Sequence, residues 1–159
     1  MGQSTNGILA YGYDLGGGDG DWKVEEVGEY GEWKPEWLKG DEDEDREDLI
    51  TQAEERLLAS VGFTETDWQA AGFFDRQRAA GARLGVEFES YCSGEYPMWL
   101  LAAHKITVYR GDCEPIDFAA LEKARAEGDW DAKLAHAVKV LGMTPKQDGP
   151  KWLLVSYWG

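Results

Sequence analysis

Val86-Glu-Phe-Glu-Ser-Tyr-Cys92, followed after a short turn by Met98-Trp-Leu-Leu-Ala-Ala-His-Lys-Ile-Thr-Val-Tyr109, decides the fold class of this chain. In the first stretch the side chains alternate strictly, and this period of two predicts a strand whose buried face holds Val86, Phe88, Ser90 and Cys92. The second stretch is the most apolar in the chain. Its β-branched and aromatic end favours a strand over a helix because such residues fit a pleated sheet. Together the two stretches predict an antiparallel hairpin.

The segments on either side of this hairpin predict further strands and helices. Strand-forming residues fill Asn6–Leu15 and Trp152–Trp158, and weak alternation over Trp22–Val27 predicts another strand or hairpin arm. Helical spacing of apolar residues predicts one helix with Leu49, Ile50, Ala53, Leu57 and Leu58 inward, one helix or two short ones at 68–77, and two more helices at 117–127 and 129–141. Helices that cover a mainly antiparallel sheet of about four to five strands predict an α+β fold.

Length and composition favour one folded unit. A chain of 159 residues matches a single domain, 1–159, and its eight Trp, seven Tyr and five Phe supply apolar surface for a core. The first residues lack the charged start and the apolar segment of a signal peptide. Cys92 and Cys113 are too few for a disulfide framework. We therefore expect a cytoplasmic protein with free thiols.

Acidic residues gather in the first third of the chain. Of the net charge of −15, residues 1–60 contribute −12, through 17 Asp and Glu against 5 Lys and Arg. The densest part is Gly40-Asp-Glu-Asp-Glu-Asp-Arg-Glu-Asp48, which predicts an exposed acidic segment at about residues 40–48. This charge argues against direct binding to nucleic acid or to a membrane and favours basic protein surfaces as partners. A plainer reading, in which the charge only keeps the protein soluble, stays open.

Part of this acidic run has a structural explanation. Its last residues begin the helix that follows, where carboxylates interact favourably with the helix dipole. Asp41, Asp43 and Asp45 match the first, third and fifth positions of a calcium-binding loop. Arg46 stands where that loop requires glycine and Gln52 where it requires glutamate, so neither a metal site nor a cofactor is predicted. The surplus of charge at the start of the run has no structural reason.

A binding surface is predicted beside this surplus. In Gly28–Leu38 aromatic residues recur every three or four positions, while glycines and Pro35 interrupt any helix, so Tyr30, Trp33 and Trp37 are expected to be partly exposed. Exposed Trp and Tyr near charged residues are typical of binding hot spots. The predicted partner-binding residues are Asp41, Glu42, Asp43, Glu44, Asp45, Trp33 and Trp37.

Two other classes of function stay open. A small cytosolic enzyme would have a pocket where the glycine-rich turn Gly16–Asp21 meets Cys92 and His104. The turn itself does not match a phosphate-binding loop, because the third glycine of that motif would fall at Asp21. A structural or assembly protein would instead pair an edge strand with a second copy of the chain. The sequence leaves the oligomeric state open.

Four segments of the chain carry a resemblance. They are Ile8-Leu-Ala-Tyr-Gly-Tyr-Asp-Leu-Gly-Gly17, Cys92-Ser-Gly-Glu-Tyr-Pro-Met98, Thr107-Val-Tyr-Arg-Gly-Asp112 and Trp152-Leu-Leu-Val-Ser-Tyr-Trp-Gly159. Through them most of the chain resembles small acidic proteins of unknown function from actinobacteria and their bacteriophages. The resemblance implies a setting, in which small acidic phage proteins often bind host or defence proteins. It assigns no role to any residue.

The expected function is therefore that of a phage-type accessory protein acting in the host cytoplasm. It would bind a basic protein surface through its acidic first third, and the expected partner is a nucleic-acid-binding host protein. In the sharper version of this expectation, the acidic surface is a DNA mimic that inhibits a host or defence protein.

Overall fold

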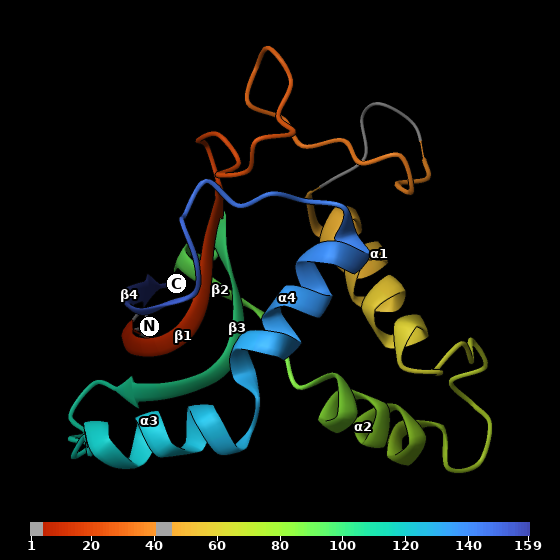
Figure 1. Ribbon diagram of the computed structural model, residues 1–159. Coiled ribbons are helices and arrows are strands. Elements are labelled where there is room, and N and C mark those ends of the chain that lie inside the picture. Colours follow the sequence, from red (N-terminus) through yellow and green to blue (C-terminus); the bar gives the residue numbers. More distant parts are fainter. Residues whose placement is uncertain (1–4, 41–45) are drawn as a thin grey trace.

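Helices pack on a four-stranded, mainly antiparallel sheet, which gives the chain an α+β fold (Figure 1). The computed structural model describes residues 5–40 and 46–159. Within them the elements follow in the order β1 (Thr5–Gly17), α1 (Arg46–Ser60), α2 (Phe73–Leu84), β2 (Glu87–Ser93), β3 (Pro97–Tyr109), α3 (Phe118–Glu127), α4 (Trp130–Leu141) and β4 (Lys151–Trp158). The predicted fold class is confirmed, and so is the hairpin of β2 and β3.

The sheet closes on itself. Its strand order is β1-β3-β2-β4, and the ring is completed where the end of β2 runs parallel to the end of β4. A register shift between Tyr11 and Gly12 bends β1 along this ring. A Cβ atom at Gly12 would lie 1.9 Å from the Leu101 carbonyl oxygen, so only glycine allows β1 and β3 to approach this closely.

The inside of the closed sheet has a hydrophobic core of its own. Its buried and half-buried members are Ile8, Ala10, Tyr91, Met98, Leu100, Ala102, Leu153, Val155 and Tyr157. Both faces of β2 are therefore covered: Phe88 packs against the helices, while Tyr91, on the face opposite the one predicted to be buried, packs inside the ring. Cys92 was predicted to be buried and is exposed. Cys92 has a left-handed backbone conformation, with φ 74°, so its side chain does not follow the alternation of buried and exposed side chains along β2.

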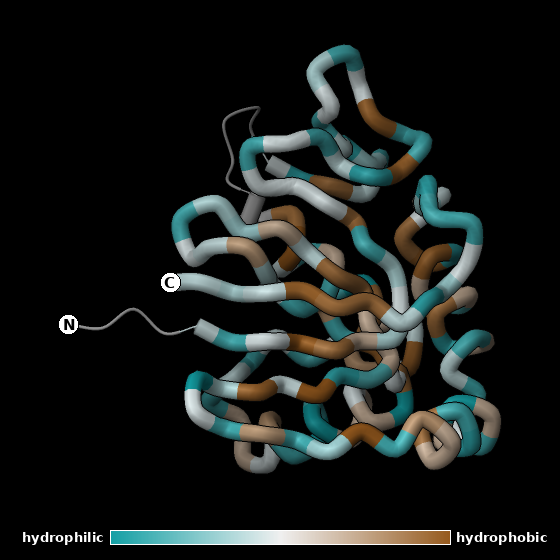
Figure 2. The backbone as a smooth tube through the Cα atoms, turned by 90° about the vertical axis from the view of Figure 1, so that its left-hand side faces the viewer, coloured by the Kyte–Doolittle hydropathy of each residue, from teal (hydrophilic) through white to brown (hydrophobic). Residues whose placement is uncertain are grey.

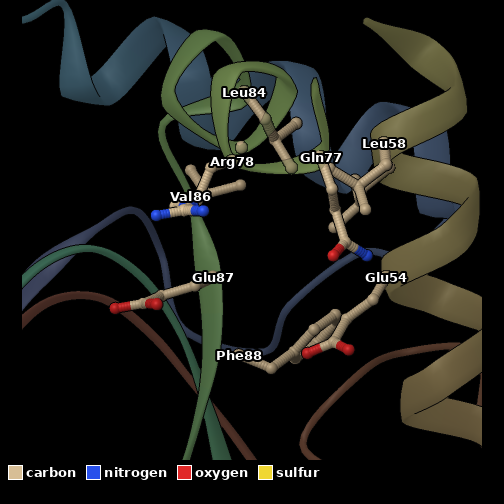
Figure 3. A pocket seen from close by; sticks show the side chains of 10 residues that line it. Glu54, Leu58, Gln77, Arg78, Leu84, Val86, Glu87 and Phe88 are labelled. Carbon is tan, nitrogen blue, oxygen red and sulfur yellow. The ribbon is translucent and has the colours of Figure 1, made fainter. Parts of the chain in front are cut away.

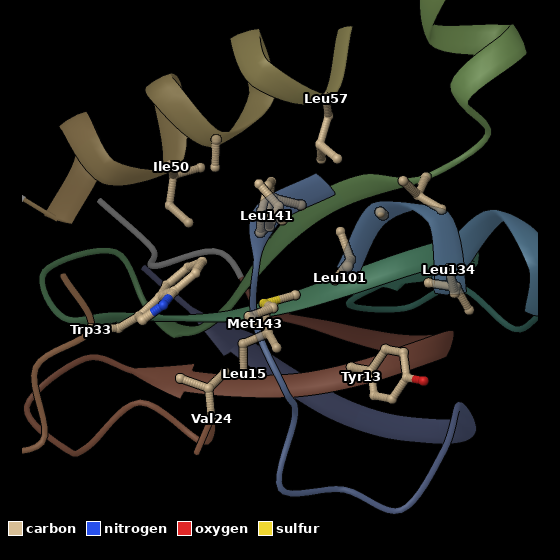
Figure 4. Packing of buried hydrophobic residues seen from close by; sticks show 14 of the residues in the cluster. Tyr13, Leu15, Val24, Trp33, Ile50, Leu57, Leu101, Leu134, Leu141 and Met143 are labelled. Carbon is tan, nitrogen blue, oxygen red and sulfur yellow. The ribbon is translucent and has the colours of Figure 1, made fainter. Parts of the chain in front are cut away.

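Helices α1 and α4 cover the outer face of the sheet (Figure 4). The residues of α1 that helical spacing predicts to be inward are indeed buried here, namely Leu49, Ile50, Ala53 and Leu57, with Leu58 half-buried. Full burial of a leucine or isoleucine side chain contributes about 1.5–3 kcal/mol. Helix α2 packs against α1 through a smaller cluster that contains Phe63, Phe73 and Ala80.

Two predicted elements differ from the structure. Residues 22–27 are not a strand. Trp22 and Val24 each make one isolated bridge, to Gly16 and to Pro145, and their side chains are buried in the core. The helix predicted from Trp68 begins only at Phe73. Gly72, with φ 77°, has a left-handed conformation that separates the preceding turn from the helix and leaves Trp68 63% exposed.

Hydrogen bonds and a cation–π contact among Tyr11 of β1, Arg125 of α3 and Asp131 of α4 connect these three elements. Tyr11 is fully buried, and its hydroxyl donates a hydrogen bond of 2.6 Å to Asp131 Oδ1. Arg125 binds both oxygens of the same carboxylate, at 3.0 and 2.8 Å, and its guanidinium lies 4.7 Å from the centroid of the Tyr11 ring. The hydrogen bonds from Arg125 and Tyr11 lower the pKa of Asp131.

Asp131→Asn is expected to lower the free energy of unfolding by about 1–2 kcal/mol at pH 7, because it removes the charged acceptor of a buried hydroxyl. The wild-type contribution is fully present above the unfolded-state pKa of about 3.9 and is lost as the pH falls through the lowered folded-state pKa. Urea denaturation should therefore give a lower free energy of unfolding for the variant at pH 7, and this difference should shrink as the pH falls below about 3.9 toward the lowered folded-state pKa. Asp129→Asn is the matched control, and an equal loss of stability in that variant would contradict the assignment.

Candidate functional site

An acidic loop, residues 18–40, follows β1 and rises above the sheet and the helices (orange in Figure 1). None of its residues belongs to a helix or a strand, and it stands out from the rest of the backbone in Figure 2. It holds seven Asp and Glu against three Lys. The predicted residues Asp41–Asp45 follow it directly in the sequence and lie outside the residues that the structure describes.

Three indole rings anchor the acidic loop. Trp22 and Trp33 are 3% and 2% exposed, and their ring centroids lie 5.8 Å apart in an edge-on arrangement. Trp33 meets Trp37 edge-on at the same distance, and Figure 4 shows Trp33 pointing into the space between α1 and β1. The indole nitrogen of Trp37 donates to the Leu141 carbonyl oxygen, at 2.8 Å, at the end of α4. Aromatic packing therefore fixes a loop that has no backbone ladder of its own.

Hydrogen bonds attach the loop to its surroundings at two further points. The Lys39 amide donates to Gln52 Oε1 at 2.8 Å, and Gln52 Nε2 donates back to the Lys39 carbonyl at 2.6 Å. Glu26 accepts hydrogen bonds from the hydroxyl and the amide of Thr144, at 2.6 and 2.8 Å. Burial acts to raise the pKa of Glu26, but the bonds from Thr144 outweigh it and lower that pKa below its ordinary value.

The loop presents one aromatic ring to solvent at its tip. A bridge between Val27 and Trp33 closes a tight turn, and Tyr30 within this turn is 84% exposed. The Tyr30 amide donates to the Glu32 carboxylate at 3.0 Å. Gly31 has φ 76°, a left-handed conformation that favours glycine. The backbone of the tip is thus held in place while the Tyr30 ring is free to make contacts.

Exposed carboxylates share the loop with Tyr30. They belong to Asp19, Asp21, Glu25, Glu26, Glu29 and Glu36. In the described part of the chain, none of the ion pairs joins a carboxylate of this loop to Lys or Arg. Lys23, one of the three lysines of the loop, is bound by Asp14 of β1 at 2.5 Å. The negative charge of the loop is therefore available to attract an external cation or basic surface.

The structure separates the predicted site residues. Trp33 is buried, so the prediction that it is exposed for contact is wrong; it packs between Trp22 and Trp37 because the glycine-broken segment folds back onto the core. Trp37 is half-buried and is held by its hydrogen bond to α4. Tyr30 was expected to be partly exposed but was left out of the predicted binding residues. Its position between Gly28 and Gly31 was the available signal, since two nearby glycines favour a tight turn.

The structure brings only part of the alternative enzyme site together. The start of the Gly16–Asp21 turn lies at the same end of β3 as Cys92, since Gly17 pairs with Met98, but His104 lies far along the strand. Cys92 pairs with Pro97 at one end of β3, whereas His104, which pairs with Tyr11, lies seven positions further along that strand, about 23 Å of strand length at about 3.3 Å per residue. The His104 ring stacks on Trp130 at 4.8 Å, and burial lowers its pKa. Among the side chains that the structure describes, no three His, Cys, Asp or Glu form a group that could hold a metal ion.

Comparison of the chain with protein-family models, with curated proteins and with solved structures gives no match. Across the two described ranges, every helix is too short or too polar to cross a bilayer. The fold and the site define the class of this protein: a small α+β domain that carries a fixed, acidic loop with an exposed tyrosine at its tip.

Proposed function

We propose that this protein binds a basic protein surface through its acidic loop, with Tyr30 at the centre of the contact and the carboxylates of the loop around it. Asp41–Asp45, which follow the loop in the sequence, add to its negative charge. One observation carries the proposal: Tyr30 is 84% exposed on a loop that buried indole rings hold in place. A fixed aromatic side chain suits binding because little conformational entropy is lost when it is covered. The partner is a basic host protein, and the place of action is the host cytoplasm.

The charge of the loop supports a partner of the opposite sign. Seven carboxylates against three lysines give residues 18–40 a net charge of −4, and residues 41–45 add five more carboxylates. The electric field of these carboxylates accelerates association with a basic surface, and dissolved salt screens it over about 8 Å at physiological ionic strength. DNA mimicry is the specific form of this proposal, in which the partner uses the same basic surface to bind DNA.

Affinity capture from an actinobacterial lysate tests the proposal. The baits are the wild-type protein, the Tyr30→Ala variant and a variant with Asp41→Asn, Glu42→Gln, Asp43→Asn, Glu44→Gln and Asp45→Asn. We expect a basic protein that the wild type retains at low salt, that a tenfold higher salt concentration releases, and that both variants retain less. Quantitative mass spectrometry gives the measurement. Release of the captured protein by duplex DNA supports mimicry, and its retention contradicts that specific form.

A charge-matched control variant distinguishes binding at a specific acidic segment from binding that depends only on the total negative charge of the protein. It converts five exposed carboxylates outside the loop to amides, at Glu55, Glu95, Asp112, Glu114 and Asp129. This variant loses the same formal charge as the Asp41–Asp45 variant and should retain the partner. If the control loses the partner equally, or if all baits retain the same proteins, the proposal is wrong.

A further inference from the structure

A hollow of about 260 Å³ lies between α1, α2 and β2 (Figure 3). Its walls are mainly apolar and comprise Leu57, Leu58, Leu84, Val86 and Phe88. Gln77, Arg78, Glu54 and Glu87 supply its polar groups. A preformed apolar hollow with a few polar groups is the usual form of a small-molecule site, and an apolar cavity of about 150 Å³ is large enough for benzene.

Among the described residues, two of the charged side chains around this hollow form ion pairs, and one does not. Arg78 pairs with Asp75 at 2.8 Å, and Glu87 lies 3.4 Å from Lys105 of β3. Glu54 takes part in none of the ion pairs that the described residues form. In Figure 3 it reaches from α1 toward Phe88, on the opposite side of the hollow from Arg78 and Glu87. An unneutralised carboxylate thus stands beside an apolar wall.

The surroundings of Glu54 disfavour its negative charge. Glu54 is exposed as a residue, but the partial burial of its carboxylate beside the apolar wall and, to a smaller extent, the Glu87 carboxylate raise its pKa. A cation placed beside Glu54 would offset both effects, and an apolar group attached to that cation would cover the half-buried Leu58 and the small surfaces that Leu84 and Phe88 leave open to the hollow. Charge and shape therefore select the same kind of ligand.

We propose that this hollow binds a small organic ammonium ion with a compact apolar tail, the ammonium group beside Glu54 and the tail against Leu58, Leu84 and Phe88. The site lies apart from the acidic loop and is independent of the function proposed for that loop. Gly81 of α2 also lines the hollow, and a Cβ atom there would meet no atom within 4 Å. A larger side chain at position 81 would thus occupy the ligand's space without displacing the fold.

Titration calorimetry with hexylamine tests the proposal, with hexanol and hexanoate as the neutral and the anionic probe of the same tail. Hexylamine should bind about tenfold more tightly than hexanol, and hexanoate should bind least. Glu54→Gln should remove this preference and leave hexanol binding unchanged, whereas Glu55→Gln, at a neighbour that does not line the hollow, should change nothing. Gly81→Leu should abolish binding of all three probes while its melting temperature stays at or above that of the wild type, because glycine is a poor helix former.

The pH dependence of hexylamine binding follows from the charged groups around the hollow. Glu54, Glu87, Arg78 and, through Glu87, Lys105 are the charged groups at the hollow. As the pH falls through the raised pKa of Glu54, its carboxylate is neutralised and hexylamine binding should weaken, while hexanol binding stays constant.

Three results would overturn the proposal: no hexylamine binding to the wild type, equal binding of hexylamine and hexanol, or undiminished binding to a folded Gly81→Leu variant. Tyr30→Ala should leave hexylamine binding intact. Failure of the ammonium site is therefore distinguishable from failure of the partner surface on the acidic loop.

Discussion

Trp33→Ala should lower the free energy of unfolding by about 3–5 kcal/mol, the range for truncating a large aromatic side chain in a core. Trp33 is 2% exposed and packs edge-on against two other indoles, so its removal leaves a cavity at the base of the acidic loop. Urea denaturation followed by circular dichroism measures the loss. The same variant should bind the partner weakly, because the loop loses the support that fixes Tyr30.

Trp68→Ala is the matched control for this change. Trp68 is 63% exposed, and a surface substitution of this kind usually alters stability by less than about 0.5 kcal/mol. If Trp33→Ala is no more destabilising than Trp68→Ala, then Trp33 does not anchor the loop.

Tyr30→Ala should reduce affinity for the captured partner about 30-fold, which corresponds to about 2 kcal/mol, the loss that marks a binding hot spot. Stability should change by less than about 0.5 kcal/mol, because the ring is 84% exposed and anchors nothing. Surface plasmon resonance measures the affinity and urea denaturation the stability. Tyr30→Phe should keep most of the affinity if the contact is made by the ring face.

Tyr109→Ala is the control variant, which removes an exposed tyrosine that lies outside the proposed binding site. Tyr109 is 58% exposed, and it lies at the end of β3, outside the acidic loop. An equal loss of affinity in both alanine variants would contradict a binding site centred on Tyr30.

The regular elements could be predicted from the sequence because their signals are local. The helical spacing from Leu49 to Leu57 identifies the buried face of α1, and the strand-forming run that ends at Tyr109 identifies β3. Closure of the sheet could not be predicted. It depends on a short pairing between the ends of β2 and β4 and on a register shift at Gly12, and both arise from contacts between distant parts of the chain.

The candidate site was predicted only in outline. The sequence places negative charge and aromatic residues together, but it gives no period from which the direction of Trp33 could be deduced, since glycines interrupt the segment. Burial of Trp33 depends on Trp22, on Trp37 and on the core beneath them. The same glycines leave Tyr30 at the tip of a turn. The binding role of Asp41–Asp45 stays a prediction, because these residues lie outside the described structure.

The most direct test of the central claim is photo-crosslinking from the tip of the acidic loop. A photoreactive phenylalanine analogue replaces Tyr30 in one protein and Tyr109 in another, and both are irradiated in lysate at low salt. We expect a salt-sensitive crosslink from position 30 to a basic protein, and none to that protein from position 109. Crosslinks of equal yield from both positions, or a basic partner captured only from position 109, would contradict it.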